Sequence, residues 1–244
     1  MLYIIGAGLG SPAFLTRKAE ECLRASDVVF VDGYTGLLSL ELLDHVRQLC
    51  PQVVVLRREQ CELEDYQPVL GAAKHGTVSF LVPGDPFTAT THHCLILRCA
   101  ELGIKYEIVP GVSIVTAALG IAGLQIYKLG LVATFPLDYS RIYSLKERVL
   151  KALQQGRHVL LLTELNIESG KCPQPEDMAR YFSELRDRWV VVLSRLGFPE
   201  QQIAACKIEE LRKIKARPPW CAVLPGDLHP VEEECLKLLA KNKF

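Results

Sequence analysis

The segment Leu2-Tyr3-Ile4-Ile5-Gly6-Ala7-Gly8-Leu9-Gly10 joins a short apolar run to three alternate glycines. A short, continuous apolar run is typical of a strand buried in a parallel sheet. Glycines directly after such a strand allow a tight turn or a close approach of backbone to a ligand. The segment therefore predicts the first strand of an α/β sheet, followed by a loop that is a candidate binding element.

Downstream of this segment, apolar runs alternate regularly with helical stripes. We expect strands at 2–5, 28–31, 53–56, 77–82 and 106–109, and helices at 16–25, 38–49, 68–74 and 91–102. Thr16 is a plausible N-cap for the first of these helices. Alternation of this kind predicts a mainly parallel sheet with helices on both faces.

The alternation changes at Pro110-Gly111. Beyond it we expect helices at 113–122, 144–155, 175–188, 208–215 and 230–241, and strands at 131–135, 158–163, 189–194 and 220–224. The less regular order, with room for hairpin pairing, predicts a mixed sheet. The chain is therefore interpreted as two α/β domains, an N-terminal one over 1–110 and a C-terminal one over 111–244.

Composition excludes several classes of function. The 28 basic and 28 acidic residues give a net charge of zero, which argues against nucleic acid as the main ligand because a duplex binder needs a basic excess. No apolar run approaches the roughly 18 residues of a membrane span, and the N-terminus lacks the basic region and cleavage site of a signal peptide. We therefore expect a cytoplasmic protein that does not bind a membrane.

The sequence predicts neither a metal site nor a hydrolase triad. Nine cysteines are present without any C-x-x-C pair, and most of them lie in apolar stripes as core residues do. The cluster His92-His93-Cys94…Cys99 is the one place that suggests zinc, but its spacing fits no standard pair of zinc ligands. There is also no G-x-S-x-G or Walker motif.

Three loops at expected strand ends are candidate binding elements, each with a structural alternative. Gly6-x-Gly8-x-Gly10 resembles a dinucleotide fingerprint, with Asp32 as the acidic residue, but the following Ser11-Pro12 delays the helix whose N-terminus would hold a phosphate. Gly84-Asp85-Pro86 is either a ligand loop or an ordinary turn. His229, after the last strand, either faces a ligand or caps the final helix.

Taken together, these segments resemble the tetrapyrrole-methylase-type (class III) S-adenosylmethionine methyltransferases, and within them the diphthine synthase family. The resemblance covers nearly the whole chain. It is carried by Tyr34-Thr35, by Gly84-Asp85-Pro86 with Ala89-Thr90-Thr91-His92, by Val109-Pro110-Gly111-Val112-Ser113, by Gly120-Ile121-x-Gly123-Leu124-Gln125-Ile126-Tyr127-Lys128-x-Gly130, by Val190-Val191-Val192-Leu193-Ser194-Arg195-x-Gly197, and by Pro225-Gly226-x-Leu228-His229-x-Val231-Glu232.

The resemblance implies methyl transfer from S-adenosylmethionine to translation elongation factor 2, as a step of diphthamide biosynthesis. The acceptor would be the amino group of a 3-amino-3-carboxypropyl chain on a modified histidine, and the enzyme would be a homodimer. Carried over by position, the cofactor contacts would be Leu9, Asp85, Thr88, Ser113, Ile114, Thr163, Leu196 and His229. No catalytic residue is assigned, and Asp85, His92 and water remain open as the proton acceptor.

Three other interpretations remain open on the sequence. Pro110-Gly111-Val112 is closer to the branch that methylates corrin or porphyrin rings, so a ring methyltransferase is the main alternative. A nicotinamide oxidoreductase and a non-catalytic adaptor are the others. In-line methyl transfer requires alignment and desolvation more than a strong acid or base, and alignment alone can supply roughly 7–11 kcal/mol, so the lack of a triad is compatible with a methyltransferase.

Overall fold

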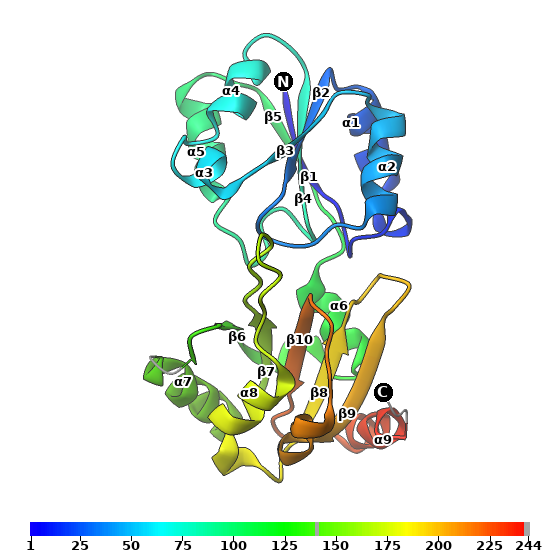
Figure 1. Ribbon diagram of the computed structural model, residues 1–244, viewed down its shortest axis with the longest axis vertical. Coiled ribbons are helices and arrows are strands. Elements are labelled where there is room, and N and C mark those ends of the chain that lie inside the picture. The colour runs from blue at the N-terminus through cyan, green and yellow to red at the C-terminus, as the bar shows by residue number, and fades with distance from the viewer. Residues whose placement is uncertain (140–141, 242–244) are drawn as a thin grey trace. The chain divides into compact units, whose positions relative to one another are not determined.

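A computed structural model of the chain describes residues 1–139 and 142–241 (Figure 1). Contacts between Cα atoms divide the chain into Met1–Ile114 and Val115–Phe244, which we call unit 1 and unit 2. Each unit is built around its own five-stranded sheet, with helices packed on it. The α/β class expected from the sequence is confirmed.

The sheet of unit 1 is wholly parallel, in the order β3-β2-β4-β1-β5. Its strands are β1 (Leu2–Gly6), β2 (Val28–Asp32), β3 (Val53–Leu56), β4 (Val78–Val82) and β5 (Tyr106–Val109). The helices between them are α1 (Arg17–Arg24), α2 (Leu40–Leu49), α3 (Arg58–Glu62), α4 (Gln67–Ala73) and α5 (His93–Glu101). The Thr16 side chain caps α1 by accepting a hydrogen bond from the Ala19 amide at 3.1 Å, as predicted.

Helices cover both faces of this sheet (Figure 1). Alternate residues of one strand point to opposite faces, so Ile4 packs with the α3, α4 and α5 side chains while Ile5 packs with those of α1 and α2. Both residues are fully buried. Burial on both faces explains why the central strands β1, β2 and β4 are apolar at nearly every position instead of at alternate ones.

The sheet of unit 2 is mixed, in the order β6-β7-β10-β8-β9. Its strands are β6 (Leu129–Phe135), β7 (His158–Thr163), β8 (Trp189–Ser194), β9 (Gln202–Lys207) and β10 (Trp220–Leu224), and its helices are α6 (Ile114–Ile121), α7 (Tyr143–Gln154), α8 (Pro175–Tyr181) and α9 (Pro230–Leu239). β10 runs antiparallel to both of its neighbours, so β7 and β8 point the same way. The direction of β10 places the residues that follow it at the end of the sheet opposite to the ends of β7 and β8.

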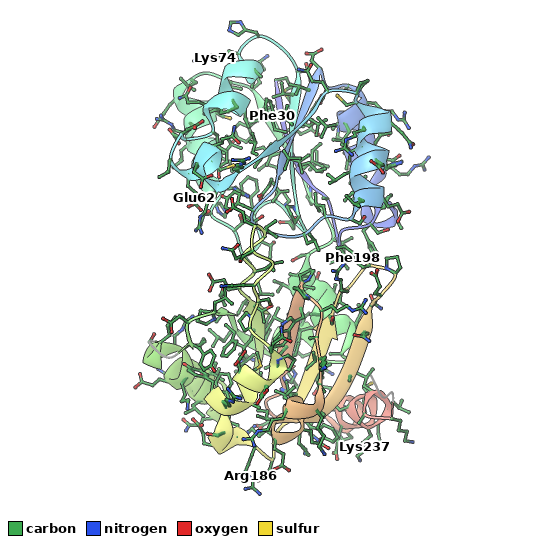
Figure 2. All side chains as sticks on the ribbon, viewed as in Figure 1. Phe30, Glu62, Lys74, Arg186, Phe198 and Lys237 are labelled. Carbon is green, nitrogen blue, oxygen red and sulfur yellow. The ribbon has the colours of Figure 1, made fainter. Side chains whose placement is uncertain are left out.

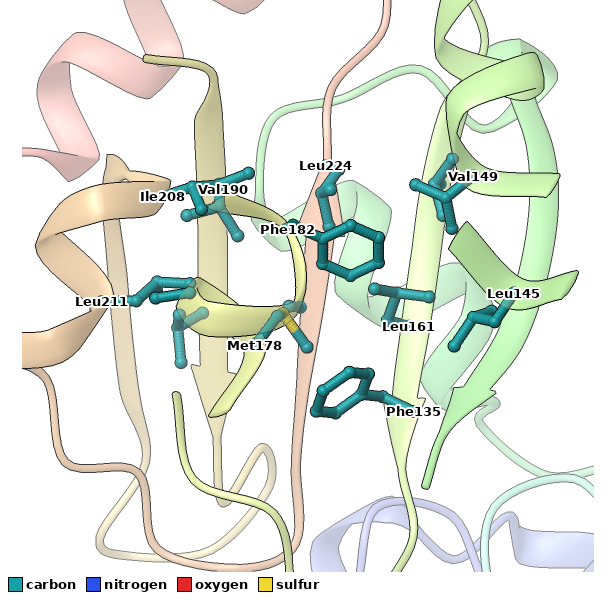
Figure 3. Close-up of a cluster of buried hydrophobic side chains, with 14 of the residues drawn as sticks. Phe135, Leu145, Val149, Leu161, Met178, Phe182, Val190, Ile208, Leu211 and Leu224 are labelled. Carbon is teal, nitrogen blue, oxygen red and sulfur yellow. The ribbon is translucent and has the colours of Figure 1, made fainter. Parts of the chain in front are cut away.

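One hydrophobic core of unit 2 lies between its sheet and the α7 and α8 layer (Figure 3). Phe135, Phe182 and Met178 meet there and are fully buried. The strand residues that face away from this core, such as Leu160 and Val191, are buried as well. The sheet of unit 2 is therefore also covered on both faces.

The structure changes two of the expected helices and adds elements that the sequence did not predict. The helix expected at 175–188 ends at Tyr181 and is followed by a short 3-10 helix at Ser183–Leu185, and the one expected at 208–215 is a 3-10 helix at Ile208–Lys213. The strand β9 and the one-turn helix α3 were not predicted. No helix of the described residues is long and apolar enough to cross a bilayer.

Candidate functional site

Three loops of unit 1 lie side by side where the adjacent strands β4, β1 and β5 end. The Gly8 amide donates to the Gly84 carbonyl at 3.0 Å, and the Gly84 amide donates to the Gly8 carbonyl at 2.8 Å. These reciprocal bonds join the loop after β1 to the loop after β4. The carboxyl edge of a parallel sheet is where open α/β folds bind ligands, so this edge is the candidate site of unit 1.

Glycines are required here because the backbones touch. A Cβ atom on Gly111 would lie 2.3 Å from the Gly84 carbonyl oxygen, and one on Gly6 would lie 2.6 Å from the Gly111 nitrogen. No side chain fits into either contact. Gly84 differs, since its φ of +72° favours glycine while nothing lies within 4 Å of the position of a Cβ. Its free side leaves room for a ligand to approach the backbone.

Asp85 joins the loop after β4 to the loop after β5. Its Oδ1 accepts hydrogen bonds from the Phe87 amide at 3.1 Å and the Thr88 hydroxyl at 2.9 Å. Its Oδ2 accepts one from the Gly111 amide at 3.3 Å. A carboxylate has about four lone-pair sites, so Asp85 can hold this arrangement and still accept a hydrogen bond from a ligand hydroxyl.

The loop after β1 is not a phosphate cradle. A 3-10 helix at Pro12–Phe14 follows Gly10, and α1 begins only at Arg17, where Thr16 already caps it. Free amides at a helix N-terminus, which phosphate binding needs, are therefore not presented next to the glycines. The structure thus disfavours the dinucleotide interpretation.

The remaining expected contacts of unit 1 lie around the same edge. Leu9 and Ser113 are buried, Thr88 is exposed, and Ile114 is the first residue of α6. Leu9 follows Gly8, and Ser113 and Ile114 follow the Pro110-Gly111 turn. The structure therefore places these residues of unit 1 on or beside the three loops after β1, β4 and β5.

In unit 2, Thr163 and Leu196 lie at the same end of the sheet, where the strands β7 and β8 finish. Thr163 ends β7, and Leu196 follows β8, which runs in the same direction. The Thr163 hydroxyl donates to the Trp220 carbonyl at the start of β10, and the Arg195 amide donates to the neighbouring Pro219 carbonyl at 2.9 Å. Both expected contacts are thus held against the entry into β10.

His229 lies at the opposite end of that sheet, where β7 begins. It follows the end of β10, where Leu224 pairs with Val159 near the start of β7. Its Nδ1 accepts from the Val231 amide at 3.3 Å and caps α9. The structure does not bring His229 together with Thr163 and Leu196, and its observed contact is the structural alternative considered for it.

The buried carboxylate of Glu232 connects the segments around Gln125 and His229, two of the segments that carry the family resemblance. Glu232 Oε1 accepts from the Gln125 amide at 2.9 Å and lies 3.1 Å from His158 Nε2, while Oε2 accepts from Lys128 Nζ at 2.6 Å and the His229 amide at 2.7 Å. Burial alone raises the pKa of Glu232, but these donors outweigh it and lower the pKa to about 2. This network stabilises unit 2 and leaves no free group for catalysis.

A second buried network lies in unit 1, beside the loop after β4. His92 Nε2 donates to Asp32 Oδ2 at 2.9 Å, and His92 Nδ1 lies 2.7 Å from the Tyr66 hydroxyl. Asp32 also accepts from the Tyr34 and Thr35 amides at 2.9 and 3.1 Å. Asp32 and His92 are fully buried, so the network joins the end of β2 to the start of α5.

The geometry removes His92 from two roles that the sequence left open. Both of its ring nitrogens are engaged and its side chain is buried, so it can neither ligate a metal nor take a proton directly from a substrate. Among the described residues, no group of three His, Cys, Asp or Glu side chains is placed to hold a metal ion. Asp85 and water remain as proton acceptors.

We expect Asp32→Asn to lower the free energy of unfolding by about 1–3 kcal/mol, because an amide keeps only part of the acceptor capacity that His92, the Tyr34 amide, and the amide and hydroxyl of Thr35 use. The loss of binding free energy for a ligand of the loop around Asp85 should be smaller than this loss of stability. Urea unfolding and calorimetric titration measure the two effects. Asp44→Asn, at an exposed pair with Arg47, should change stability by less than about 0.5 kcal/mol; an equal loss in both variants would contradict a role of the buried network.

Comparisons with known proteins show what the chain is similar to. A model of the family Tetrapyrrole (Corrin/Porphyrin) Methylases matches residues 1–212. A diphthine synthase of Pyrobaculum neutrophilum is 37% identical over 256 residues, covering 100% of this chain and 99% of that protein. A diphthine synthase of Methanocella arvoryzae is 34% identical over 256 residues, covering 100% of both.

Relatives also occur outside the archaea and among solved structures. An Arabidopsis thaliana protein named "Probable diphthine methyl ester synthase" is 32% identical over 272 residues, covering 97% of each chain. A crystal structure of a diphthine synthase superposes with a TM-score of 0.87 at 29% identity, covering 98% of this chain and 96% of that one. The full length of the chain thus takes part in the similarity.

Proposed function

Because the chain belongs to the tetrapyrrole (corrin/porphyrin) methylase family and, within it, to the diphthine synthases, S-adenosylmethionine-dependent methyltransferases, we propose that it methylates translation elongation factor 2. The acceptor is the amino group of the 3-amino-3-carboxypropyl chain on the modified histidine of that factor. The enzyme works as a cytoplasmic homodimer and binds neither nucleic acid nor a membrane.

One observation carries the proposal for the cofactor: the glycine-packed loops held by Asp85. S-adenosylmethionine has ribose hydroxyls that donate hydrogen bonds but no phosphate, and the loops offer a carboxylate acceptor beside the open side of Gly84, with no phosphate cradle. Leu9, Thr88, Ser113 and Ile114 would complete the contacts of unit 1. Thr163 and Leu196 would supply those of unit 2, and His229 would contribute only if its capping contact opened.

The chemistry needs little from acidic or basic side chains. S-adenosylmethionine supplies a methyl group on a positively charged sulfur, which leaves as the neutral thioether when the amine nitrogen bonds to the methyl carbon. Each transfer releases one proton from nitrogen. The protein contributes alignment of the acceptor and exclusion of water, and Asp85 or a water molecule accepts the proton.

Asp85→Ala should weaken S-adenosylmethionine binding at least tenfold, because the change removes the acceptor for the ribose and releases the Phe87, Thr88 and Gly111 donors. Asp85→Asn should weaken it less, since the amide oxygen still accepts. Isothermal titration of both variants and of the unchanged enzyme gives the three affinities. An unchanged affinity in Asp85→Ala would reduce Asp85 to a turn residue.

Radiolabelled methyl transfer to elongation factor 2 that carries the precursor chain tests the proposed reaction. Label in the factor, with none in a corrinoid or porphyrinogen, supports the proposal over a ring methyltransferase. Label in the ring compound alone would overturn it. Because the plant relative's name points to a methyl ester, mild alkaline hydrolysis of the labelled factor distinguishes methyl groups on nitrogen, which remain, from an ester, which is lost.

A further inference from the structure

Arg195, at the turn after β8, has an unusual backbone conformation. Its φ of +55° lies in the left-handed region, which favours glycine and is rare for a long side chain. The Arg195 amide donates to the Pro219 carbonyl at 2.9 Å, so the conformation is held by a neighbouring segment. A strained residue that keeps a long charged side chain is a candidate for function.

The Arg195 side chain is half-buried, and no acidic side chain of the described residues forms an ion pair with it. Its Nε atom is buried and has no hydrogen-bond acceptor among the described residues. Its guanidinium carbon lies 5.3 Å from the centre of the Phe198 ring, which is itself buried and lies beside the turn between β8 and β9 (Figure 2). The ion pairs of the described residues do not include Arg195.

A buried, unpaired guanidinium donor is costly unless a ligand satisfies it. In the same unit, the partly buried cation of Lys128 ends on Glu232 at 2.6 Å. The guanidinium of Arg195 instead lies over the Phe198 ring, a cation–π contact that leaves its hydrogen-bond donors unused. An acceptor group with two oxygens would satisfy the unused donors of this guanidinium.

We propose that Arg195 binds the carboxylate of an α-amino acid end in the reaction. The proposal rests on the proposed function, because both reactants then carry such an end: the methionine part of S-adenosylmethionine and the 3-amino-3-carboxypropyl chain of the acceptor. A guanidinium binds a carboxylate through two parallel hydrogen bonds. Arg195 also adjoins Leu196, at the same sheet edge as Thr163, where the cofactor contacts of unit 2 are proposed.

Three ligands distinguish the two carboxylates. We would titrate Arg195→Gln with S-adenosylhomocysteine and with 5′-methylthioadenosine, which lacks the amino acid end, and measure KM and kcat for modified elongation factor 2. If Arg195 binds the cofactor carboxylate, affinity for S-adenosylhomocysteine falls at least tenfold and affinity for methylthioadenosine is unchanged. If it binds the acceptor carboxylate, both affinities are unchanged and KM for the factor rises at least tenfold.

Further variants keep the test independent of folding. Arg195→Lys keeps the charge without the planar fork, so it should restore only part of the loss. Arg195→Gly suits the backbone angle and should fold while losing the same function. Arg217→Gln removes an exposed arginine whose backbone bonds to Ser194, and it should leave all three measurements unchanged.

Two results would overturn the inference. One is an Arg195→Gln variant in which both affinities and the KM stay the same. The other is an equal loss of affinity for both small ligands together with a lower Tm, which indicates a structural role. An unchanged enzyme that binds S-adenosylhomocysteine but does not methylate the factor refutes the proposed acceptor instead, and the comparison of the two small ligands still tests Arg195.

Discussion

Replacing Gly111 by alanine is expected to weaken S-adenosylmethionine binding at least a hundredfold. The new methyl carbon would lie 2.3 Å from the Gly84 carbonyl oxygen and 2.8 Å from Gly6 backbone atoms. These are backbone atoms that no rotamer change can move, so the loops must separate. Separation breaks the bond from the Gly111 amide to Asp85 and displaces the open side of Gly84. Isothermal titration with S-adenosylmethionine measures the loss.

Gly120→Ala is the matched control for this change. Gly120 is an exposed glycine of α6 with nothing within 4 Å of the position of a Cβ, so alanine should preserve binding and add up to about 1 kcal/mol of stability. Circular dichroism of both variants checks that the sheets are intact. Tight binding by Gly111→Ala would show that the contact between the loops is not needed for the cofactor.

Replacing Glu232 by alanine is expected to lower the free energy of unfolding by about 3–5 kcal/mol. The variant leaves the Lys128 ammonium and the Gln125 and His229 amides without their acceptor, in a site where Glu232 is 1% exposed. A loss of that size corresponds to a Tm lower by about 10 °C for a chain of this length. Glu233→Ala, which removes an exposed partner of Lys237, should cost less than about 1 kcal/mol.

The same carboxylate gives stability a dependence on pH. Its pKa is about 2 in the folded protein against an ordinary 4.5, so its contribution, about 3 kcal/mol by linkage, is complete above pH 4.5 and is lost as the pH falls toward 2. Burial also lowers the pKa of His158, which acts in the same direction below pH 6.5. Urea unfolding between pH 7 and pH 2 should show a loss in that window that Glu232→Gln lacks; parallel curves would contradict the assignment.

Much of the fold could be predicted from the sequence because most buried strands consist largely of consecutive apolar residues. β7, β8 and β10 have the predicted bounds, since each contains an unbroken run of at least four apolar residues with turn residues beyond its ends. β9 was missed because Gln202–Lys207 carries Ala-Ala-Cys where strands prefer branched side chains. Its antiparallel pairing with β8 along six residues, from Trp189 with Lys207 to Ser194 with Gln202, imposes the strand that its composition does not.

The site was less predictable, for a reason of topology. In a parallel sheet all carboxyl ends meet at one edge, so Gly8 and Gly84 could be expected to lie together, and they do. The same rule fails in unit 2, where β10 runs against β7 and carries His229 to the other edge. Nothing in the local sequence indicates that Asp32 pairs with His92, 60 residues away, or that Glu232 pairs with Lys128. Arg195 was recognised only as part of a family segment.

The contact between Lys128 and Glu232 also sets an order for the assembly of unit 2 during translation. The donors at Gln125, Lys128 and His158 leave the ribosome before their shared anion, which lies 104 residues after Lys128. Until α9 arrives, the nascent β-sheet must keep these groups in water or on a chaperone. If translation pauses between β10 and α9, all strands of the unit 2 sheet have been synthesised, but the Glu232 carboxylate that accepts from these donors has not.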